Sequence, residues 1–169
     1  MTRMVIVAIV LAIAPRTAAA APCPGNPDAL GTERVLEADA KSTPRVGRKQ
    51  FPSTLPLRTK ELVLTFDDGP WPGTTPRILD ALKNECVRAT FFLLGGNTAA
   101  HPQLARRALT EGHSIGHHTY SHPLLDHMPL AKAEAEIDQG IAADESARHP
   151  QRPFSGFRDL PQTPPCWIA

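Results

Sequence analysis

The chain has 169 residues, of which 18 are lysine or arginine and 17 are aspartate or glutamate. This length fits a single domain. The balanced charge argues against nucleic-acid binding or anionic-membrane binding as the main role, because both favour a clear excess of basic residues.

The first 21 residues have the pattern of a secretory signal peptide. Arg3 precedes an apolar run over residues 5–14, and four alanines follow at positions 18–21. The run is short for a membrane span, since a transmembrane helix needs about 20 apolar residues. We therefore expect residues 1–21 to direct export to the periplasm or the extracellular space, with a retained membrane anchor as the alternative.

Residues 22–58 are rich in proline, glycine and charged residues and show no sustained periodicity, so we expect an extended linker. The chain has three cysteines, Cys23, Cys86 and Cys166. In an exported protein at least one of the three thiols is left unpaired or forms an intermolecular bond. The cysteine spacing is not that of a metal site, and Pro22 argues against lipid attachment at Cys23.

From Glu61 onward, predicted strands and helices alternate. The expected strands are a buried one over Leu62–Phe66, one over Ala89–Gly95 and a short one over His113–His117. The expected helices begin at Thr74 or Thr75, at Pro102 and at about Pro129, and Gly95, Gly96 and Asn97 are expected to form a loop over a cleft. This alternation predicts an α/β fold with a parallel sheet.

Chemically reactive side chains follow the first and third predicted strands. Asp67 and Asp68 end the first strand, and His118 and His122 follow the third. Each pair alone could be only a turn or two surface histidines. Together they favour a functional site, because catalytic groups collect at the carboxyl ends of strands in α/β folds. One carboxylate and two imidazoles suit Zn²⁺ or a similar divalent ion with a position left for water, and the second carboxylate is free to act as a base.

The segments Thr65-Phe66-Asp67-Asp68-Gly69-Pro70 and His118-Thr119-Tyr120-Ser121-His122 resemble the first two motifs of the polysaccharide deacetylases, the NodB homology domain or carbohydrate esterase family four. The resemblance extends from about Glu61 to Arg158. It implies a distorted (β/α) barrel in which Asp67 is the catalytic base. It also implies that Asp68, His118 and His122 bind a divalent metal ion, first of all Zn²⁺, with Co²⁺ or Mn²⁺ as alternatives; no further cofactor is expected.

Two local geometries are needed for this assignment. Neighbouring residues of a strand point to opposite faces, so we expect a sharp turn at Gly69-Pro70 to bring both aspartates to one cleft. The two histidines need one helical turn or an irregular loop between them. The other histidines are expected to lie away from the site, with His117 facing away and the remaining ones on the surface: His101, His113, His127 and His149.

The resemblance implies removal of N-acetyl groups from polymers that contain N-acetylglucosamine, such as chitin oligosaccharides or peptidoglycan. Acetylated glycan is then the expected binding partner, with no nucleic acid and no obligate protein partner evident. An esterase that removes O-acetyl groups from xylan-like polymers would use the same site and is the first alternative.

The resemblance ends abruptly near Ser155. The family's Arg-x-Pro motif should follow the last helix, but Arg158 is followed by Asp159 and Leu160. We therefore expect residues 59–158 to form an incomplete barrel and residues 159–169 to be an irregular tail, which a reading-frame shift at Ser155 would explain. A catalytically inactive fragment is the second alternative.

Overall fold

The computed structural model describes residues 23–36, 45, 51–52 and 54–148. The predicted signal peptide, the position of the missing Arg-x-Pro motif and the irregular tail therefore lie outside the described residues. In the described part, no helix has the length and apolar character needed to cross a membrane.

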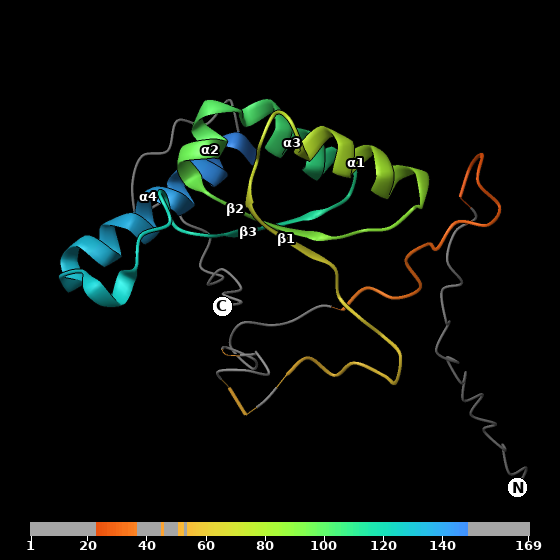
Figure 1. Cartoon of the computed structure of the whole chain (residues 1–169), viewed down its shortest axis with the longest axis horizontal. Coiled ribbons are helices and arrows are strands. Elements are labelled where there is room, and N and C mark those ends of the chain that lie inside the picture. The colour runs from red at the N-terminus through yellow and green to blue at the C-terminus, as the bar shows by residue number, and fades with distance from the viewer. Residues whose placement is uncertain (1–22, 37–44, 46–50, 53, 149–169) are drawn as a thin grey trace, which may run out of the picture.

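Strands and helices alternate along the chain, as the sequence predicts. The elements in order are β1 (Thr65–Gly69), α1 (Thr75–Asn84), β2 (Thr90–Leu93), α2 (Gly95–Ala100), α3 (Pro102–Thr110), β3 (Ser114–His117), a 3₁₀ turn (Leu125–His127) and α4 (Leu130–Arg148). The strands form one parallel sheet in the order β1-β2-β3. The helices lie on one face of this sheet (Figure 1), which confirms the predicted α/β class with a parallel sheet.

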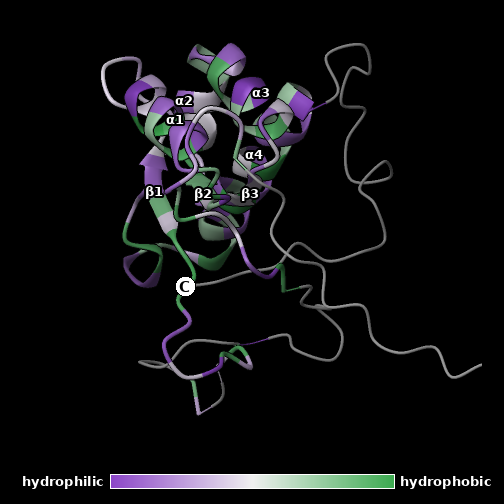
Figure 2. Cartoon of the chain, turned by 90° about the vertical axis from the view of Figure 1, so that its right-hand side faces the viewer, coloured by the Kyte–Doolittle hydropathy of each residue, from purple (hydrophilic) through white to green (hydrophobic). Residues whose placement is uncertain are grey.

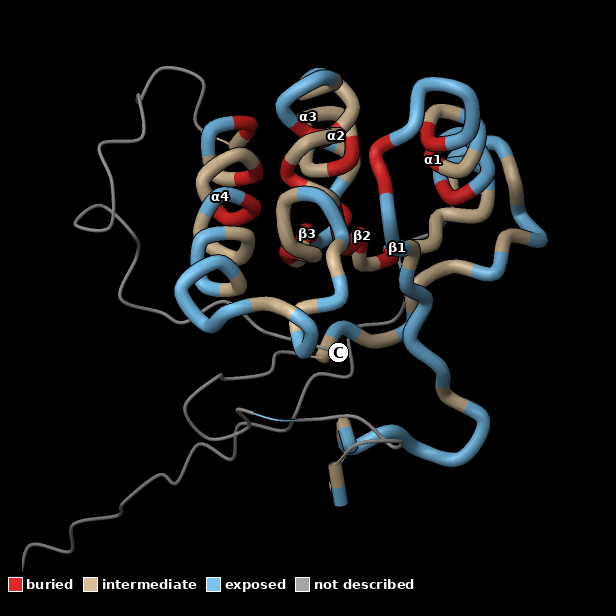
Figure 3. The backbone as a smooth tube through the Cα atoms, turned by 60° about the vertical axis from the view of Figure 1, so that its left-hand side comes forward, coloured by how far each residue is buried: buried red, intermediate tan, exposed pale blue. Residues whose placement is uncertain are grey.

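The core lies between the sheet and these helices. Alternate residues of β2, Phe91 and Leu93, face the helices and are 2% and 1% exposed. Leu79 of α1 is fully buried against them, and Phe66 of β1 stacks on Phe91 with ring centroids 5.2 Å apart. Burying each such side chain contributes about 1.5–3 kcal/mol to folding. Figure 3 shows the buried positions on the inner sides of the helices, which face the strands and one another.

The predicted buried strand over Leu62–Phe66 is displaced in the structure. β1 begins only at Thr65, and Leu62, Val63 and Leu64 are 78%, 43% and 36% exposed. Figure 2 shows this hydrophobic segment leading into β1 below the helical layer. Among the described residues no helix covers it, so apolar character alone does not bury it.

The prediction of a loop over Gly95, Gly96 and Asn97 is wrong, because these residues begin helix α2. The amide of Gly95 donates to the carbonyl of Thr119 over 2.9 Å, and the amide of Gly96 donates to that of Tyr120 over 2.9 Å. The first N–H groups of a helix have no partner inside the helix. Here a neighbouring loop supplies these partners, which allows a glycine-rich segment to become helical.

The spacing of Leu130, Ala133, Ile137 and Ile141 in the sequence predicts one apolar face on helix α4, and the structure buries this face only in part. Ile141 is 7% exposed, as expected, but Leu130 is 74% exposed. The first turns of α4 extend beyond the edge of the sheet (Figure 1), so they have no core to pack against in the described part of the chain.

The segment 23–36 contains no helix or strand but is attached to the turn between α1 and β2. A disulfide joins Cys23 to Cys86, and the amide of Gly31 donates to the carbonyl of Glu85 over 2.8 Å. Arg34 forms an ion pair with Glu61, and its hydrogen bond is the main cause that lowers the pKa of Glu61 to about 2. This part of the predicted linker is thus held against the domain.

We expect the disulfide to contribute substantially to stability. It closes a loop with a sequence separation of 63 residues, and chain-entropy arguments give about 4 kcal/mol for a loop of that length. Cys86→Ser, in a Cys166→Ser background that prevents thiol exchange, should lower the free energy of unfolding by up to this amount in urea titrations. Reductant should then have no additional effect on the variant, and an unchanged unfolding midpoint would contradict the prediction.

Candidate metal centre

Asp68 is separated from the regular alternation of β1 by a bulge. Asp67 pairs with Phe92 and Gly69 pairs with Leu93, which leaves Asp68 as an extra residue. The backbone φ of Asp68 is 66°, in the left-handed region that residues other than glycine adopt uncommonly. Neighbouring residues of a regular strand point to opposite faces, and the bulge at Asp68 breaks this alternation. Asp68 therefore does not have to point away from Asp67, and the predicted turn at Gly69-Pro70 is not the sole cause. Both aspartates are exposed at the carboxyl end of the strand.

The two histidines lie on an irregular loop after β3, which was one of the two predicted arrangements. The amide of His118 still donates to the carbonyl of Leu93 over 3.0 Å, so its position is tied to β2. Thr119 and His122 then adopt φ values of 64° and 62°, and the hydroxyl of Thr119 accepts a hydrogen bond from the amide of His122 over 3.0 Å. This tight turn brings the His122 ring back beside that of His118, with centroids 4.8 Å apart.

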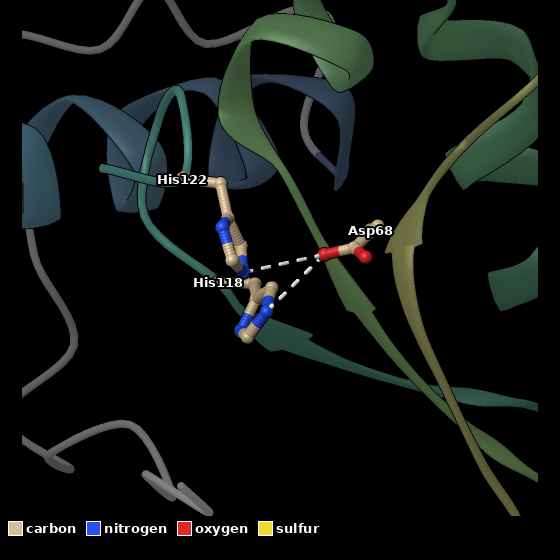
Figure 4. A group of neighbouring side chains, drawn as sticks. All are labelled: Asp68, His118 and His122. Carbon is tan, nitrogen blue, oxygen red and sulfur yellow. Dashed lines mark ion pairs between the residues drawn. The ribbon is translucent and has the colours of Figure 1, made fainter. Parts of the chain in front are cut away.

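The three predicted ligands converge (Figure 4). Oδ1 of Asp68 lies 3.3 Å from Nε2 of His118 and 3.6 Å from Nε2 of His122. The three ligand atoms all lie within 4.8 Å of one another. The carboxylate comes from β1 and the imidazoles come from the loop after β3, so the fold assembles the group from two separate segments.

These distances fit a divalent metal ion. Bonds of about 2.0–2.2 Å from Zn²⁺ to nitrogen and oxygen place tetrahedral donors roughly 3.3 Å apart. The side chains of Asp68, His118 and His122 are 57%, 28% and 55% exposed, which leaves one side of the group open for water or a substrate oxygen.

Leu94 and the first turn of α2 support both the end of β1 and the histidine loop. On one side the amide of Leu94 donates to the carbonyl of Gly69 over 2.8 Å, and Nδ2 of Asn97 donates to the carbonyl of Asp68 over 3.0 Å. On the other side Gly95 and Gly96 bind the histidine loop. Asn97 could not be predicted as a supporting residue from the sequence, because its partner is a backbone group 29 positions away.

Two other histidines are buried on the helical side of the sheet. His117 faces away from the ligand group, as predicted, and its Nδ1 lies 2.8 Å from Oδ2 of Asp144 on α4. Burial raises the pKa of Asp144, although the hydrogen bond to His117 opposes this shift.

The prediction that His113 lies on the surface is wrong, because this residue is 6% exposed. Its Nδ1 accepts a hydrogen bond from the amide of Ala89, and burial lowers the pKa of His113. His127 is exposed as predicted, and His149 lies outside the described residues.

Helices α2 and α4 meet the histidine loop through glycine. A Cβ at Gly140 would lie 2.6 Å from both the carbonyl carbon and the oxygen of Thr119, and a Cβ at Gly95 would lie 2.7 Å from Cα of Gly140. Real Cβ atoms do not come this close to backbone, so the backbones themselves would have to move apart.

Gly140→Ala should therefore destabilise the fold by about 1–3 kcal/mol, as overpacking usually does. Urea unfolding measures this loss. Gly73→Ala is the matched control, because a Cβ at Gly73 meets nothing within 4 Å. Equal stability of the two variants would refute the close approach.

Comparison with known proteins supports the interpretation of the motifs. The family model described as polysaccharide deacetylase matches residues 55–155, more than half of the chain. The chain belongs to the polysaccharide deacetylase family. The four predicted site residues all fall inside the matched range, and metal dependence is the norm in this family.

Similarity to individual deacetylases covers part of each chain. A peptidoglycan-N-acetylglucosamine deacetylase of Bacillus cereus is 56% identical over 70 residues, 41% of this chain and 26% of its own length. A chitooligosaccharide deacetylase of Bradyrhizobium sp. is 40% identical over 102 residues, 57% of this chain and 47% of its own length. The family 4 carbohydrate esterase from Streptomyces lividans, solved in complex with acetate, is 36% identical with a TM-score of 0.50, over 52% of this chain and 45% of that one. The chain thus spans less than half the length of these relatives.

Proposed function

We propose that this chain carries the metal-binding half of a deacetylase site that hydrolyses N-acetyl groups of N-acetylglucosamine-containing glycans. The observation that carries the proposal is the convergence of Asp68, His118 and His122, with a further carboxylate, Asp67, next to Asp68 in the chain. A bound divalent ion, for which we propose Zn²⁺, would polarise the acetyl carbonyl and acidify a water molecule. An amide is a poor electrophile, so it needs this activation.

Asp67 is the proposed general base. It is exposed at the end of β1, and the residue before it, Phe66, packs into the core and fixes the backbone there. Asp67 would take the proton from the attacking water, whose oxygen bonds to the acetyl carbon. As the carbon–nitrogen bond breaks, the sugar nitrogen would take the proton held by Asp67 and become a free amine, and acetate would leave. A positioned base of this kind contributes typically about 10²–10⁴-fold to the rate.

The names of the relatives support two candidate classes of substrate for this chain. The Bacillus cereus and Bradyrhizobium proteins are named for peptidoglycan N-acetylglucosamine and for chitooligosaccharide, which supports an N-acetylated glycan here. The Streptomyces lividans relative is named an esterase and holds acetate, which keeps removal of O-acetyl groups as a second candidate. Export is also part of the proposal: it is supported by the signal-like residues 1–21, and the disulfide fits an oxidising compartment.

Acetate release by the purified chain without residues 1–21 tests the proposal. Chitopentaose and peptidoglycan fragments are compared with acetylated xylan, each with Zn²⁺ and with a chelator. Zinc-dependent acetate release from chitopentaose or peptidoglycan is the expected result. Release from xylan alone would favour the esterase, and release from none of them would assign this chain to the inactive-fragment alternative.

A further inference from the structure

Helix α4 runs along β3 and its loop in a regular series of contacts. Every fourth helix residue meets every second residue of the opposite segment. The four pairs are Glu136 with Ser121, Gly140 with Thr119, Asp144 with His117, and Arg148 with Ile115. Within β3, two strand residues span about 6.6 Å and four helical residues rise about 6.0 Å, so Arg148 and Asp144 meet Ile115 and His117 in register. The irregular loop after His117 continues the contacts with Gly140 and Glu136.

The two acidic members of this series each contact the residue that directly precedes a ligand histidine. Oε2 of Glu136 accepts from the amide of Ser121 and Oε1 accepts from its hydroxyl, both over 2.9 Å, and Ser121 precedes His122. Oδ2 of Asp144 lies 2.8 Å from Nδ1 of His117, which precedes His118. The side chains of Asp144 and His117 are 0% and 6% exposed, so solvent does not compete for this contact.

The histidine loop needs such external contacts. Thr119 and His122 both have positive φ, a conformation that persists only where the surroundings hold it. The backbone of Thr119 abuts Gly140 in the middle of the series. The loop is therefore held from the helical side at three successive points, while its imidazoles point toward Asp68 (Figure 4).

We propose that Glu136 and Asp144 are positioning residues, which set the metal affinity of the centre by fixing the residues before its two histidine ligands. Neither is itself a ligand. The inference rests on the proposed metal centre, and it adds that α4, which contributes no ligand, controls how well the ligands are arranged. Residues that orient metal ligands usually change affinity by about 10–100-fold when they are removed.

Glu136 offers the cleanest test, because its contact lies near the surface and its removal leaves no buried group. Co²⁺ binding, followed by its visible spectrum, and Zn²⁺ competition against Co²⁺ are measured for the parent chain and for Glu136→Ala. We expect affinity to fall about 10-fold or more. Glu136→Gln, which keeps an acceptor for the Ser121 amide, should fall less. Glu134→Ala on the same helix, at an exposed position, is the matched control and should bind like the parent.

Unfolding of the metal-free proteins is measured alongside, to separate affinity from stability. Ser121→Ala should lower affinity and should make the Glu136→Ala change smaller when the two are combined. Asp144→Ala is expected to lower affinity as well, and if that variant does not fold, the Glu136 and Ser121 variants still decide. No Co²⁺ binding by the parent would overturn the metal centre and this inference together. Parent-like binding by a folded Glu136→Ala would overturn the inference alone, as would a loss fully explained by unfolded protein.

Discussion

Replacing both His118 and His122 by alanine is expected to abolish specific binding of Zn²⁺ by this chain. Their Nε2 atoms lie 3.3 and 3.6 Å from Oδ1 of Asp68, so the double replacement leaves one of the three proposed ligands. Four-ligand zinc sites in small peptides bind with about 10–16 kcal/mol, which corresponds to a loss on the order of 10²-fold or more for each ligand removed. Equilibrium dialysis against Zn²⁺ measures the loss.

The single variants and one control make this result specific. His118→Ala and His122→Ala should each lose most of the affinity, since two remaining ligands seldom hold such an ion. His127→Ala removes a histidine that is 71% exposed and lies on the 3₁₀ turn, and it should bind like the parent. If the double variant still retained zinc as the parent does, the ion would have to bind elsewhere.

Replacing Asp68 and replacing Asp67 are expected to impair different properties, metal binding in the first case and the rate of acetate release in the second. Asp68→Asn should lose metal, because a neutral amide oxygen replaces the only carboxylate ligand. Asp67→Asn should keep the metal and lose about 10²–10⁴-fold in the rate of acetate release, as expected for a removed general base. Dialysis gives the metal content and acetate release gives the rate on the same preparations.

The two aspartates differ in their place in β1. Asp67 keeps its pairing with Phe92, whereas Asp68 is the extra residue of the bulge and lies beside His118 and His122. Asp67→Glu is a useful companion, since it keeps the charge but moves the oxygen by one methylene. Equal metal loss in the Asp67→Asn and Asp68→Asn variants would show that both aspartates are ligands. It would contradict the assignment of Asp67 as the base and Asp68 as the ligand.

The elements that the sequence predicted well are those with strong local signals. Helix α1 has Pro76 in its first turn and Leu79 and Leu82 buried on one face, and α3 ends before Gly112, which has a φ of 86°. The convergence of Asp68, His118 and His122 was also predictable, because the motifs follow strands whose carboxyl ends meet at one edge of a parallel sheet.

What the sequence could not predict depends on contacts between distant residues. Helix α2 forms from a glycine-rich segment because the histidine loop supplies acceptors for its first amides. His113 is buried because Phe91, on the neighbouring strand, packs edge-to-face against it with ring centroids 5.3 Å apart. The bulge at Asp68 is a matter of register between β1 and β2, and no residue within β1 specifies it.

The disulfide also determines at which end of the sheet a tag, fusion partner or solid support joined to the amino-terminal side would meet the domain. Cys86 precedes β2, at the amino end of the parallel strands, whereas the ligand group lies at their carboxyl end. Four residues of strand separate the two ends by about 13 Å. A tag, fusion partner or solid support joined ahead of Cys23 therefore meets the domain at the end opposite the ligand group. Immobilisation from the amino-terminal side would leave the exposed side of the Asp68, His118 and His122 group facing the solution.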